Sequence, residues 1–594
     1  MHDPGGVPYA RFDAFDGTGV GWELAGLVDV CEARRIEEVE PALRAVEAAV
    51  AEGRHAAGYV AYEAAPGLDG SLTTHAPRSD LPLVWFGIFA ERRPVHPPPP
   101  PAEAARGITA PWHPALDPAE HAARVSAIRE WIAAGDTYQV NLTFPLRADA
   151  PATDAELYAA LGSAQRAAYC ALLRLPRVSV VSASPELFFR WTGRELELRP
   201  MKGTRPRGRW LEEDRERAAE LAGSAKDRAE NLMIVDLLRN DAGRVAEFGS
   251  VEVARLVEVE SYPTVLQLTS SIRARTREGT TLADLFRALF PCGSVTGAPK
   301  VRTMQIIRAL EDAPRGVYAG AVGLVSPGEA VFNVPIRTLL LDRESGRMEM
   351  GVGSGITWDS DAAAEYAECL QKAAFTRHRP PTFSLLETMA YHPAEGVRYR
   401  EEHLGRMAAS AAYFGYPMDA AGVERALDEA LLGAEGARRV RLLLDAGGAI
   451  RVETAPLGET PRVLRARLAA RPVDSADPLL QHKTSWRAPY EERLAEVPGY
   501  DEVLLVNERG ELTEFANGNL VVRLGGVDWT PPRDCGLLPG VLRQVLLRTG
   551  EVRERVLRAE DLQNAEEVYR INSVRGWTRV VFPEAEGRPV PRGT

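Results

Sequence analysis

The sequence predicts an α+β protein made of successive parts. The chain has 594 residues, whereas one domain usually has roughly 100–200, so three or four compact units are expected. From about residue 115 to residue 376, apolar runs typical of strands alternate irregularly with helical patterns. The basic, helix-breaking segment 377–382 interrupts the chain, and a new pattern begins at residue 383. The chain therefore divides near residue 380 into a larger first half and a smaller second half.

The composition excludes several classes of partner. Hydrophobic residues make up 45% of the chain and charged residues 26%, as in ordinary globular proteins. The net charge of -12 argues against nucleic acid and anionic membranes as main partners. We find no apolar run long enough to span a membrane and no signal-peptide pattern in residues 1–9. Five scattered cysteines without CxxC spacing predict reduced thiols, so we expect a cytoplasmic protein without a structural transition metal.

The first 110 residues contain two apolar runs, at 57–63 and 83–89, that are typical of buried strands. The proline-rich stretch 94–101 after them is expected to be extended and unpacked. A helical pattern follows over 118–134 and ends at a Gly-Asp pair. We therefore expect a region of residues 1–110 ahead of a larger domain at 115–376.

Two segments of this larger domain are predicted helices with paired carboxylates. Asp227 and Glu230 are three residues apart in the helix 224–241, so they share one face. The helix 361–372 repeats the spacing with Glu365 and Glu368, and Lys372 follows one turn later. Carboxylates from two helices can hold Mg²⁺, which prefers oxygen ligands and keeps waters for an anionic substrate. Two solvated helix faces would show the same spacing.

Asp227 has a second explanation. Ser224 and Asp227 have the spacing of a capping box, so capping of the helix would by itself explain an acidic residue at Asp227. This favours Glu230 and Glu368 as the metal ligands.

Two turns carry groups suited to an anionic substrate. Residues 199–207 predict a strand and a turn that contains Lys202, although most Lys-Gly pairs belong to basic surface loops. Residues 291–300 are a turn of small residues before a helix with an apolar face formed by Met304, Ile306, Ile307 and Leu310. Such a turn offers backbone N–H groups and a helix dipole to an anion, here a carboxylate. Each turn by itself is a weak signal.

Seven segments in order resemble the chorismate-utilising enzymes, which comprise anthranilate, aminodeoxychorismate, isochorismate and salicylate synthases. The resemblance extends over about residues 115–376, and residues 1–110 resemble a shortened form of the family's N-terminal region. It implies a fold like anthranilate synthase component I, a β-sandwich with helices. The segments are 135–142 (GDTYQVNL), 184–186 (SPE), the Lys202 turn, the Ser224 helix, the Gly293 turn, 336–339 (IRTL) and 365–368 (EYAE).

Two positions distinguish the members of this family. The resemblance implies that a lysine in a Pro-x-Lys-Gly-Thr turn marks aminodeoxychorismate synthases, where anthranilate synthases carry alanine; here it is Lys202. A deprotonated lysine can attack C2 of chorismate, expel the C4 hydroxyl and be displaced when ammonia adds at C4. Gln139 occupies the place of the lysine base of the water-adding members, and it cannot take a proton from water. The resemblance thus favours aminodeoxychorismate synthesis.

The resemblance also implies roles for other residues. Glu186 would protonate the departing hydroxyl, and Mg²⁺ on Glu230 and Glu368 would clamp the ring carboxylate. The remaining implied substrate contacts are the cations Arg337 and Lys372 and the neutral donors Thr296 and Gly297.

Gln267 departs from the family pattern. Many relatives carry a histidine at this position of the strand 265–268. Glutamine still forms hydrogen bonds but cannot become charged, which leaves a substrate contact open and puts proton transfer there in doubt.

No glutaminase motif is present in the chain. We find no cysteine in a nucleophile elbow with a matching histidine, and no convincing feedback pocket for an amino acid. Ammonia is therefore expected from a separate glutamine amidotransferase subunit or from solution.

Lys483 is the notable residue of the second half, among polar and aromatic neighbours at 479–490. A hairpin is predicted at 503–514, with strands at 503–506 and 511–514. Each feature alone is unspecific. Together with 387–389 (ETM), 402–407 (EHLGRM) and 537–543 (LLPGVLR), they resemble the class IV pyridoxal-phosphate enzymes over about residues 383–582. This implies a fold-type IV unit of two α/β subdomains in the domain 383–594.

The class IV resemblance implies a cofactor site. Lys483 would form the Schiff base and shuttle protons, and Glu514 would keep the pyridine nitrogen protonated. Leu542 stands where the family often has threonine, so one hydroxyl contact is lost. The phosphate would be held by Arg406, by backbone N–H groups of the turn with Val541 and Leu542, and by Ser573. Class IV enzymes commonly dimerise, so a homodimer through this half is also expected.

The class IV motifs do not choose between aminodeoxychorismate lyase and the branched-chain or D-amino-acid aminotransferases. Fusion to an aminodeoxychorismate-forming half favours the lyase, in which Lys483 removes a proton at C4 and pyruvate leaves. The sequence thus predicts synthesis of 4-aminobenzoate, a folate precursor, from chorismate. Two alternatives are an anthranilate synthase fused to an unrelated aminotransferase, and a second half that binds without turnover.

Overall fold

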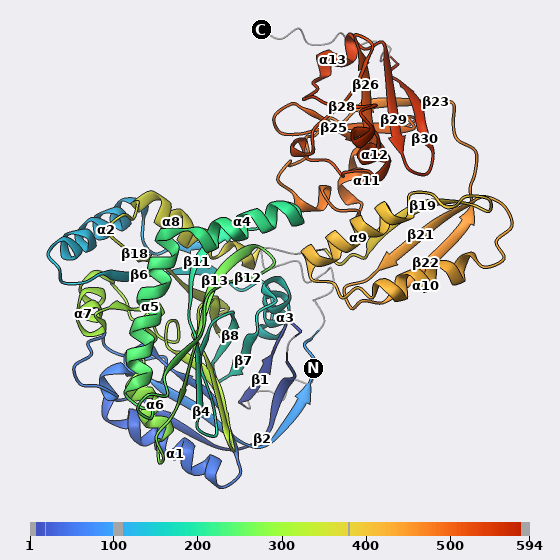
Figure 1. Cartoon of the computed structure of the whole chain (residues 1–594). Coiled ribbons are helices and arrows are strands. Elements are labelled where there is room, and N and C mark those ends of the chain that lie inside the picture. The colour runs from blue at the N-terminus through green and yellow to red at the C-terminus, as the bar shows by residue number, and fades with distance from the viewer. Residues whose placement is uncertain (1–7, 18, 99–110, 378–380, 584–594) are drawn as a thin grey trace. The chain divides into compact units, whose positions relative to one another are not determined.

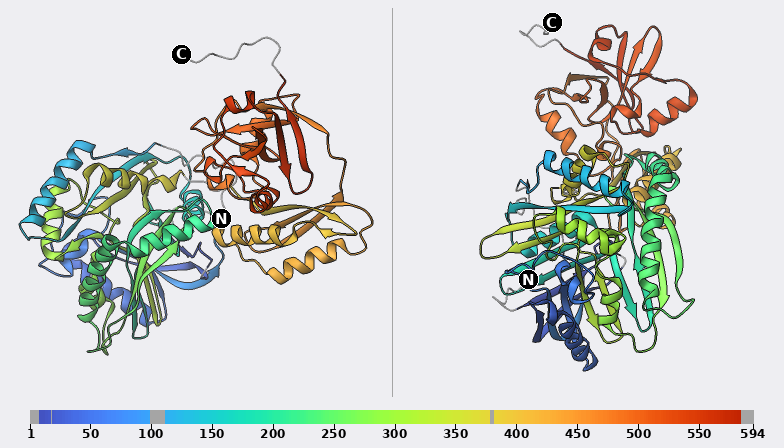
Figure 2. Two further views of the ribbon diagram at one scale, coloured as in Figure 1. Left: turned by 45° about the horizontal axis from the view of Figure 1, so that its top comes forward. Right: turned by 90° about the vertical axis from the view of Figure 1, so that its left-hand side faces the viewer.

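The computed structural model describes residues 8–17, 19–98, 111–377 and 381–583. The chain forms two compact units (Figures 1 and 2). One unit comprises Met1–Arg207 and Ala218–Pro380, and the other comprises Gly208–Arg217 and Pro381–Thr594. The boundary between the two units near residue 380 coincides with the basic segment 377–382. Residues 378–380 of this segment lie outside the described part of the chain.

A single antiparallel sheet organises the first unit. Among the described residues it has 18 strands, and its hydrogen-bonded order is β6-β18-β17-β8-β7-β1-β2-β4-β3-β15-β16-β9-β10-β13, with β11 and β12 both on β13. The strands β1–β4 lie in the middle of this order, so the first 110 residues share the sheet with later ones. The strands are β1 Tyr9–Asp13, β2 Gly21–Ala33, β3 His55–Val60, β4 Val84–Val95, β5 His113–Pro114, β6 Gln139–Asp149, β7 Tyr169–Arg174, β8 Val178–Ser184, β9 Leu187–Thr192, β10 Glu195–Arg199, β11 Met201–Pro206, β12 Glu252–Ser261, β13 Val265–Arg275, β14 Gly297–Ala298, β15 Ala321–Ser326, β16 Glu329–Asn333, β17 Thr338–Asp342 and β18 Arg347–Ile356.

The helices before residue 380 start at clear signals in the sequence. Asp117 caps α2 with its side chain, with proline as the first helical residue, and Asp361 caps α8. The Ser224 hydroxyl accepts the N–H of Asp227 at the start of α5. The helices are α1 Val39–Ala51, α2 Pro118–Ala133, α3 Asp154–Gln165, α4 Leu211–Gly223, α5 Ala225–Gly243, α6 Leu282–Leu289, α7 Lys300–Leu310 and α8 Ala362–Gln371.

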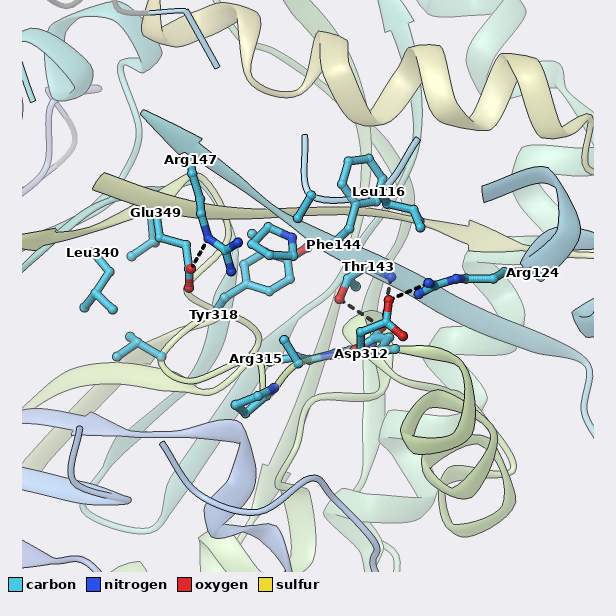
Figure 3. Close-up of a pocket in the computed structure, with 18 residues that line it drawn as sticks. Leu116, Arg124, Thr143, Phe144, Arg147, Asp312, Arg315, Tyr318, Leu340 and Glu349 are labelled. Carbon is cyan, nitrogen blue, oxygen red and sulfur yellow. Dashed lines mark hydrogen bonds and ion pairs between the residues drawn. The ribbon is translucent and has the colours of Figure 1, made fainter. Parts of the chain in front are cut away.

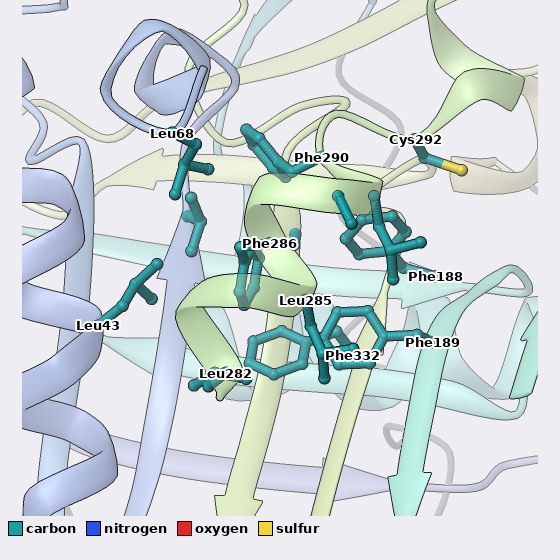
Figure 4. Close-up of a cluster of buried hydrophobic side chains, with 14 of the residues drawn as sticks. Leu43, Leu68, Phe188, Phe189, Leu282, Leu285, Phe286, Phe290, Cys292 and Phe332 are labelled. Carbon is teal, nitrogen blue, oxygen red and sulfur yellow. The ribbon is translucent and has the colours of Figure 1, made fainter. Parts of the chain in front are cut away.

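Around strand β15 the sheet is buried on both faces. Along β15, Ala321 and Val325 belong to one apolar cluster, whereas Val322 and Leu324 belong to another. This follows because successive side chains point to opposite faces of a strand. Figure 4 shows the aromatic centre of the larger cluster, where helix α6 packs on the sheet. Its rings are Phe188, Phe189, Phe286, Phe290 and Phe332.

The second unit combines a small sheet with a closed barrel. The sheet has the order β20-β19-β21-β22, and α9 packs on β19 while α10 packs on β22. In the other sheet the ring β25-β24-β23-β30-β29-β26 closes because β26 also pairs with β25, which leaves those strands without a free edge. The elements are β19 Leu385–His392, β20 Gly396–Val397, α9 Arg400–Phe414, α10 Ala420–Leu431, β21 Arg438–Leu444, β22 Ile450–Pro456, β23 Val463–Leu468, α11 Ala488–Ala495, β24 Glu502–Val506, β25 Leu512–Phe515, β26 Gly518–Leu524, β27 Val527–Thr530, α12 Val541–Thr549, β28 Arg553–Glu554, α13 Ala559–Gln563, β29 Glu567–Asn572 and β30 Gly576–Val581.

Most of the predicted elements are present with shifted ends. The run 57–63 divides into strand β3 and a 3₁₀ turn at Tyr62–Gly67, and the run 83–89 extends as β4 to Val95. Pro94 therefore lies within a strand, whereas the end of the proline-rich stretch, from residue 99, lies outside the described residues. The helices expected at 118–134, 224–241 and 361–372 are α2, α5 and α8.

The aromatic cluster gives a test of the fold. Phe286 is fully buried and its ring centroid lies 5.0 Å from that of Phe332, so Phe286→Ala leaves a cavity. We expect a loss of about 3–5 kcal/mol in the free energy of unfolding. Phe248→Ala is the matched control, because the Phe248 side chain is fully exposed. Equal denaturation midpoints for the two variants would contradict this packing.

Candidate active sites

Lys202 lies on a distorted part of strand β11. The register of β11 against β13 shifts between Met201 and Thr204, which marks a β-bulge. Gly203 has φ +88°, and a Cβ there would lie 3.1 Å from the Asp227 Cβ. Bulges re-aim side chains next to functional sites, and this one needs glycine for both its conformation and its packing.

Gln267 on β13 holds this bulge in place. Its amide nitrogen donates to the Gly203 carbonyl at 2.8 Å, and its amide oxygen accepts the Thr204 hydroxyl at 2.9 Å. Gln267 is 9% exposed. Both ends of the amide are thus engaged by the two residues that follow Lys202. The residue predicted as a substrate contact is, in this structure, a clamp on the lysine turn.

Burial decides the state of the Lys202 amine. Loss of solvent lowers its pKa, and the Lys372 charge adds to this effect. The carboxylates of Glu230, Glu186 and Glu368 act in the opposite direction, but the pKa stays below its ordinary value. The sequence-predicted nucleophile, acid and metal ligands are therefore within electrostatic range of one another.

Gln139 lies beside Lys202, and its side-chain amide has no hydrogen-bond partner among the described residues. Gln139 is fully buried. A Cβ on Gly355 of β18 would lie 2.6 Å from the Gln139 amide nitrogen and 3.3 Å from the Lys202 Nζ. The absence of a side chain at Gly355 keeps this space open. A buried amide without partners is a group that a bound ligand can satisfy.

Glu186 has the environment of a general acid. It is 3% exposed, and its Oε1 has no hydrogen-bond partner in the described part of the chain. Burial raises the pKa of Glu186 to about 7, against the opposing effects of the Ser294 hydroxyl and the Lys202 charge. The carboxyl is thus partly protonated near neutral pH and can donate a proton.

The small-residue turn at 291–300 is braced from within. Thr296 donates its hydroxyl to the Cys292 carbonyl at 3.1 Å and its N–H to the Gly293 carbonyl at 3.3 Å. Gly297 has φ +139°, and a Cβ there would lie 2.1 Å from the Gln139 carbonyl oxygen. Thr296 therefore uses its donors inside the turn, while Gly297 sets the close approach of the turn to Gln139.

Arg337 is held in a strained position. Its backbone has φ +51°, which is uncommon for a residue with a side chain, and its guanidinium donates to the Gln165 amide oxygen. The Arg337 carbonyl accepts the N–H of Ala183 at 3.1 Å. Such strain is typical of positions that must present a group in one direction. Gln165 is a contact that the sequence did not suggest.

The four predicted metal ligands, Asp227, Glu230, Glu365 and Glu368, have different surroundings. Asp227 accepts the Arg205 guanidinium at 2.9 Å, and Glu365 accepts the Ser360 hydroxyl at 2.7 Å. Burial raises the pKa of Glu230, and the charges of Asp227 and Glu365 add to the rise against that of Lys202. Glu368 pairs with Lys372 at 2.7 Å. Within the described residues no group of three or more His, Cys, Asp or Glu side chains forms a ready metal site.

A cavity of about 220 Å³ lies behind these segments, between β6, β18 and the loop after α7 (Figure 3). None of the predicted catalytic side chains lines it. Arg315 at its wall pairs with Glu311 at 2.7 Å and donates to the carbonyls of Val295 and Asn141, both at 2.8 Å. Asn141 and Val295 are close in sequence to Gln139 and Thr296. The pair Glu311–Arg315 thus supports the backs of two site segments.

Lys483 of the second unit is half-buried as a residue, and its amine is desolvated. Its carbonyl accepts the N–H of Leu386, and the next residue, Thr484, forms a bridge with Leu385, which fixes the segment against β19. Burial, and then the Arg406 charge, lower the pKa of Lys483 to about 8. An amine with this pKa is largely neutral in mildly alkaline solution and can form an imine.

Arg406 is more constrained than the sequence suggested. It donates from Nε and Nη2 to the Glu387 carboxylate at 2.8 and 2.6 Å, and from Nη1 to the Pro539 carbonyl at 3.1 Å. His403 Nδ1 lies 2.6 Å from the same carboxylate. Although burial opposes ionisation, Arg406 and His403 lower the pKa of Glu387 to about 2. A guanidinium has five N–H groups, so two remain for a phosphate.

Glu514 receives donors on both oxygens. The Tyr490 hydroxyl and the Leu538 N–H donate to its Oε1 at 2.8 and 3.0 Å, and the Asn519 amide donates to its Oε2 at 3.2 Å. Burial nevertheless raises the pKa of Glu514 to about 7. The sequence identified Glu514 but assigned no role to Tyr490, and it missed Asn519. Asn519 is the cross-strand partner of Glu514 in the hairpin β25–β26, a local feature that the sequence reading did not extend to, whereas Tyr490 and Leu538 reach Glu514 only in the folded unit.

The predicted phosphate turn opens helix α12. Gly540 is its N-cap residue, and Val541 and Leu542 form the first turn. The Leu542 side chain is 5% exposed and belongs to an apolar cluster with Val521 and Leu546. Leucine therefore contributes packing where the family often has a hydroxyl. Ser573 is 8% exposed and follows strand β29.

Each unit thus contains a lysine whose pKa is lowered by desolvation, together with acidic side chains within electrostatic range. Residues 8–378 match the family model described as chorismate binding enzyme, and residues 384–581 match the model described as amino-transferase class IV. The first match covers more than half of the chain, so the protein belongs to the chorismate-binding enzyme family. The fold predicted from the resemblance, with its class IV second part, is confirmed.

Curated relatives match the first half of the chain. It is 44% identical over 250 residues to anthranilate synthase component 1 1 of Haloarcula marismortui, covering 42% of this chain and 51% of that one. It is 42% identical over 266 residues to aminodeoxychorismate synthase component 1 of Escherichia coli, covering 45% of this chain and 58% of that one. The chain thus spans about half the length of these relatives.

Anthranilate synthase component I of Streptococcus pneumoniae is a similar solved structure. It is 25% identical, has a TM-score of 0.50, and the match covers 62% of this chain and 90% of that one. Because both kinds of synthase are similar, the choice between them depends on individual residues.

Removal of the Gln267 clamp tests the geometry around Lys202. Gln267→Leu loses both hydrogen bonds to the bulge, each of which contributes about 0.5–1.5 kcal/mol to the unfolding free energy. We expect lower stability in denaturant. Gln305→Leu on the exposed face of α7 is the control and should match the unmodified protein. A Gln267→Leu variant as stable as this control would contradict the clamp.

Proposed function

We propose that the chain makes 4-aminobenzoate from chorismate in two steps. The first unit converts chorismate and ammonia to 4-amino-4-deoxychorismate, and the second eliminates pyruvate from that product. The observation that carries the first assignment is the buried Lys202 amine, presented by a bulge and within electrostatic range of Glu186. An alanine at this position, as in anthranilate synthases, could form no covalent adduct.

The first unit supplies a nucleophile and an acid. The Lys202 nitrogen forms a bond to C2 of chorismate, both ring double bonds shift by one position, and the C4–oxygen bond breaks. Glu186 gives its proton to the departing hydroxyl, which leaves as water. Ammonia then adds at C4, both double bonds shift back, and the C2–nitrogen bond breaks to restore Lys202. The unpartnered amide of Gln139 offers a donor and an acceptor but no base, so water is not activated there.

A magnesium ion belongs to this proposal. Glu230 and Glu368 lie on different helices and are both within electrostatic range of Lys202 and Lys226. Their oxygens suit Mg²⁺, and the carboxylate charges gathered around Glu230 favour a cation. Asp227 and Glu365 each accept a hydrogen bond from another side chain, and Glu368 is paired with Lys372 at 2.7 Å. Glu368 would exchange this lysine contact for the ion and hold it together with Glu230. The ion would neutralise the carboxylate of the substrate ring.

The second unit has a site that fits pyridoxal phosphate. It combines a desolvated lysine amine of lowered pKa, a buried carboxylate and an arginine with two N–H groups left over. When bound, the cofactor would act as an electron sink for carbon–hydrogen cleavage. Lys483 would hold the cofactor and carry the proton from C4, and Glu514 would bind the pyridine nitrogen. Arg406, the first turn of α12 with Val541 and Leu542, and Ser573 would hold the phosphate.

Ammonia is proposed to come from a separate glutamine amidotransferase subunit, since the first half is similar to proteins named aminodeoxychorismate synthase component 1. A homodimer through the second unit and a cytoplasmic location complete the proposal. The five cysteines are all free thiols, which agrees with a reducing compartment. Among the described residues no helix is long and apolar enough to cross a membrane.

Product analysis tests the two assignments. Chorismate, an ammonium salt, Mg²⁺ and pyridoxal phosphate are given to the unmodified protein and to Lys202→Ala and Lys483→Ala. We expect 4-aminobenzoate from the unmodified protein and accumulated aminodeoxychorismate from Lys483→Ala. Lys202→Ala should lose activity by roughly 10²–10⁴-fold or more, because it removes the nucleophile.

Two results would contradict the proposal. Formation of 2-aminobenzoate by the unmodified protein would make the first unit an anthranilate synthase. An unchanged rate of 4-aminobenzoate formation by Lys483→Ala would remove the lyase assignment. Lys300→Ala is not suitable as a control, because Lys300 forms a buried ion pair with Asp241 at 2.8 Å. Lys226→Ala is a better comparison for Lys202→Ala. It removes a lysine from the helix that carries Glu230 but removes no proposed nucleophile.

The pKa of Glu186, about 7, predicts the pH dependence of the first step. Its carboxyl must be protonated to act, so its contribution falls as the pH rises through 7. Glu186→Gln should lose about 10²–10⁴-fold in kcat/KM. The protonation of ammonia affects both proteins equally, so the ratio of the unmodified rate to the Glu186→Gln rate isolates this group. A ratio that is constant from pH 6 to pH 9 would contradict the role of Glu186.

A further inference from the structure

The loop Leu538–Gly540 contacts both ends of the proposed cofactor site. The Leu538 N–H donates to Glu514 at 3.0 Å, at the end assigned to the pyridine nitrogen. The Pro539 carbonyl accepts Arg406 at 3.1 Å, at the end assigned to the phosphate. Gly540 then caps α12, whose first turn also belongs to the phosphate end. Three successive residues therefore connect groups that would hold opposite ends of one cofactor.

Asn519 fastens this loop to Glu514. Its amide nitrogen donates to Glu514 Oε2 at 3.2 Å and to the Leu538 carbonyl at 2.8 Å. Asn519 is 3% exposed. A Cβ on Gly540 would lie 2.0 Å from the Asn519 amide oxygen. Gly540 has an ordinary φ of -60°, so glycine is required there by the contact with Asn519 and not by backbone conformation.

Tyr490 completes the set from the other side. Its hydroxyl donates to Glu514 Oε1 at 2.8 Å, which gives this buried carboxylate three donors. Hydrogen bonds to the charged form of a carboxyl favour ionisation, whereas burial opposes it. An ionised Glu514 leaves the proton on a pyridine nitrogen, which strengthens the ring as an electron sink.

We propose that Tyr490, Asn519 and Leu538–Gly540 form one support that fixes the Glu514 carboxyl in place and ties its position to the phosphate end. The inference rests on the proposed pyridoxal-phosphate chemistry of the second unit. Tyr490 and Asn519 are positioning residues that act through Glu514 and the loop. Because the support is shared, a change at the nitrogen end also weakens the hold on the phosphate.

Binding of pyridoxal phosphate and of pyridoxal, which lacks the phosphate, measures this coupling. Both dissociation constants are determined by absorbance titration of the cofactor-free full chain. Their ratio gives the contribution of the phosphate. Asn519→Ala changes no predicted phosphate ligand, but we expect it to reduce the ratio about tenfold, as for loss of one hydrogen bond to a charged group. An unchanged ratio in Asn519→Ala would overturn the coupling.

A second variant tests the support of Glu514 with a milder change. Tyr490→Phe removes only a hydroxyl, and we expect about tenfold weaker binding of both ligands together with a shifted pH titration of the bound cofactor's absorbance. Tyr500→Phe is the matched control, because Tyr500 packs against the same apolar cluster as Tyr490. Identical affinities and titrations for the two variants would overturn the role of Tyr490.

Other outcomes of the same titrations would contradict the cofactor assignment and not the support. If the unmodified chain binds neither ligand, or binds them without Lys483, the cofactor assignment itself is wrong. If it binds both through Lys483 and only the variants behave like the control, the support is wrong while the cofactor assignment stands.

Discussion

Burial of two amines in low-dielectric surroundings is the constraint on which both proposed sites depend. A protonated lysine is costly to bury without a partner, so each site shifts its lysine toward the neutral, nucleophilic form. Only five of the 71 lysine and arginine residues of the chain are lysines. Arginine cannot lose its proton in proteins, so it can provide charge but not a nucleophile. Two of the five lysines, Lys202 and Lys483, stand where the proposed chemistry needs a neutral amine.

A neutral amine can take part in the proposed reactions only when acids and anion-binding groups are held in fixed positions around it. In the first unit these positions are set by backbone conformation. The features are a β-bulge at Gly203, a turn hydrogen-bonded by Thr296, and the positive φ of Arg337. In the second unit they are side-chain hydrogen bonds on Glu387 and Glu514 within and beside a closed barrel. Both solutions use buried carboxyls, whose raised pKa near 7 at Glu186 and Glu514 again results from loss of solvent.

The sequence suggested candidates for the reactive groups but not the contacts that hold them. Lys202, Glu186 and Lys483 stand in ordered motifs that name a chemistry, and the helices of Glu230 and Glu368 follow from spacing and caps. The clamp of Gln267 on the Lys202 turn could not be predicted, because it depends on the register of β11 against β13. Arg406 was expected to face a phosphate alone, but its pairing with Glu387 depends on the packing of α9 on β19.

Direct labelling of the lysines tests the central claim most closely. With five lysines in the chain, acylation by a limiting amine reagent can be followed peptide by peptide as the pH is varied, in cofactor-free protein. We expect the labelling of Lys483 to reach half its limit near pH 8, and that of Lys202 below the midpoint of a free lysine reference compound. Midpoints at the value of the reference compound for both residues would contradict the account, because neither amine would then be the nucleophile that burial creates.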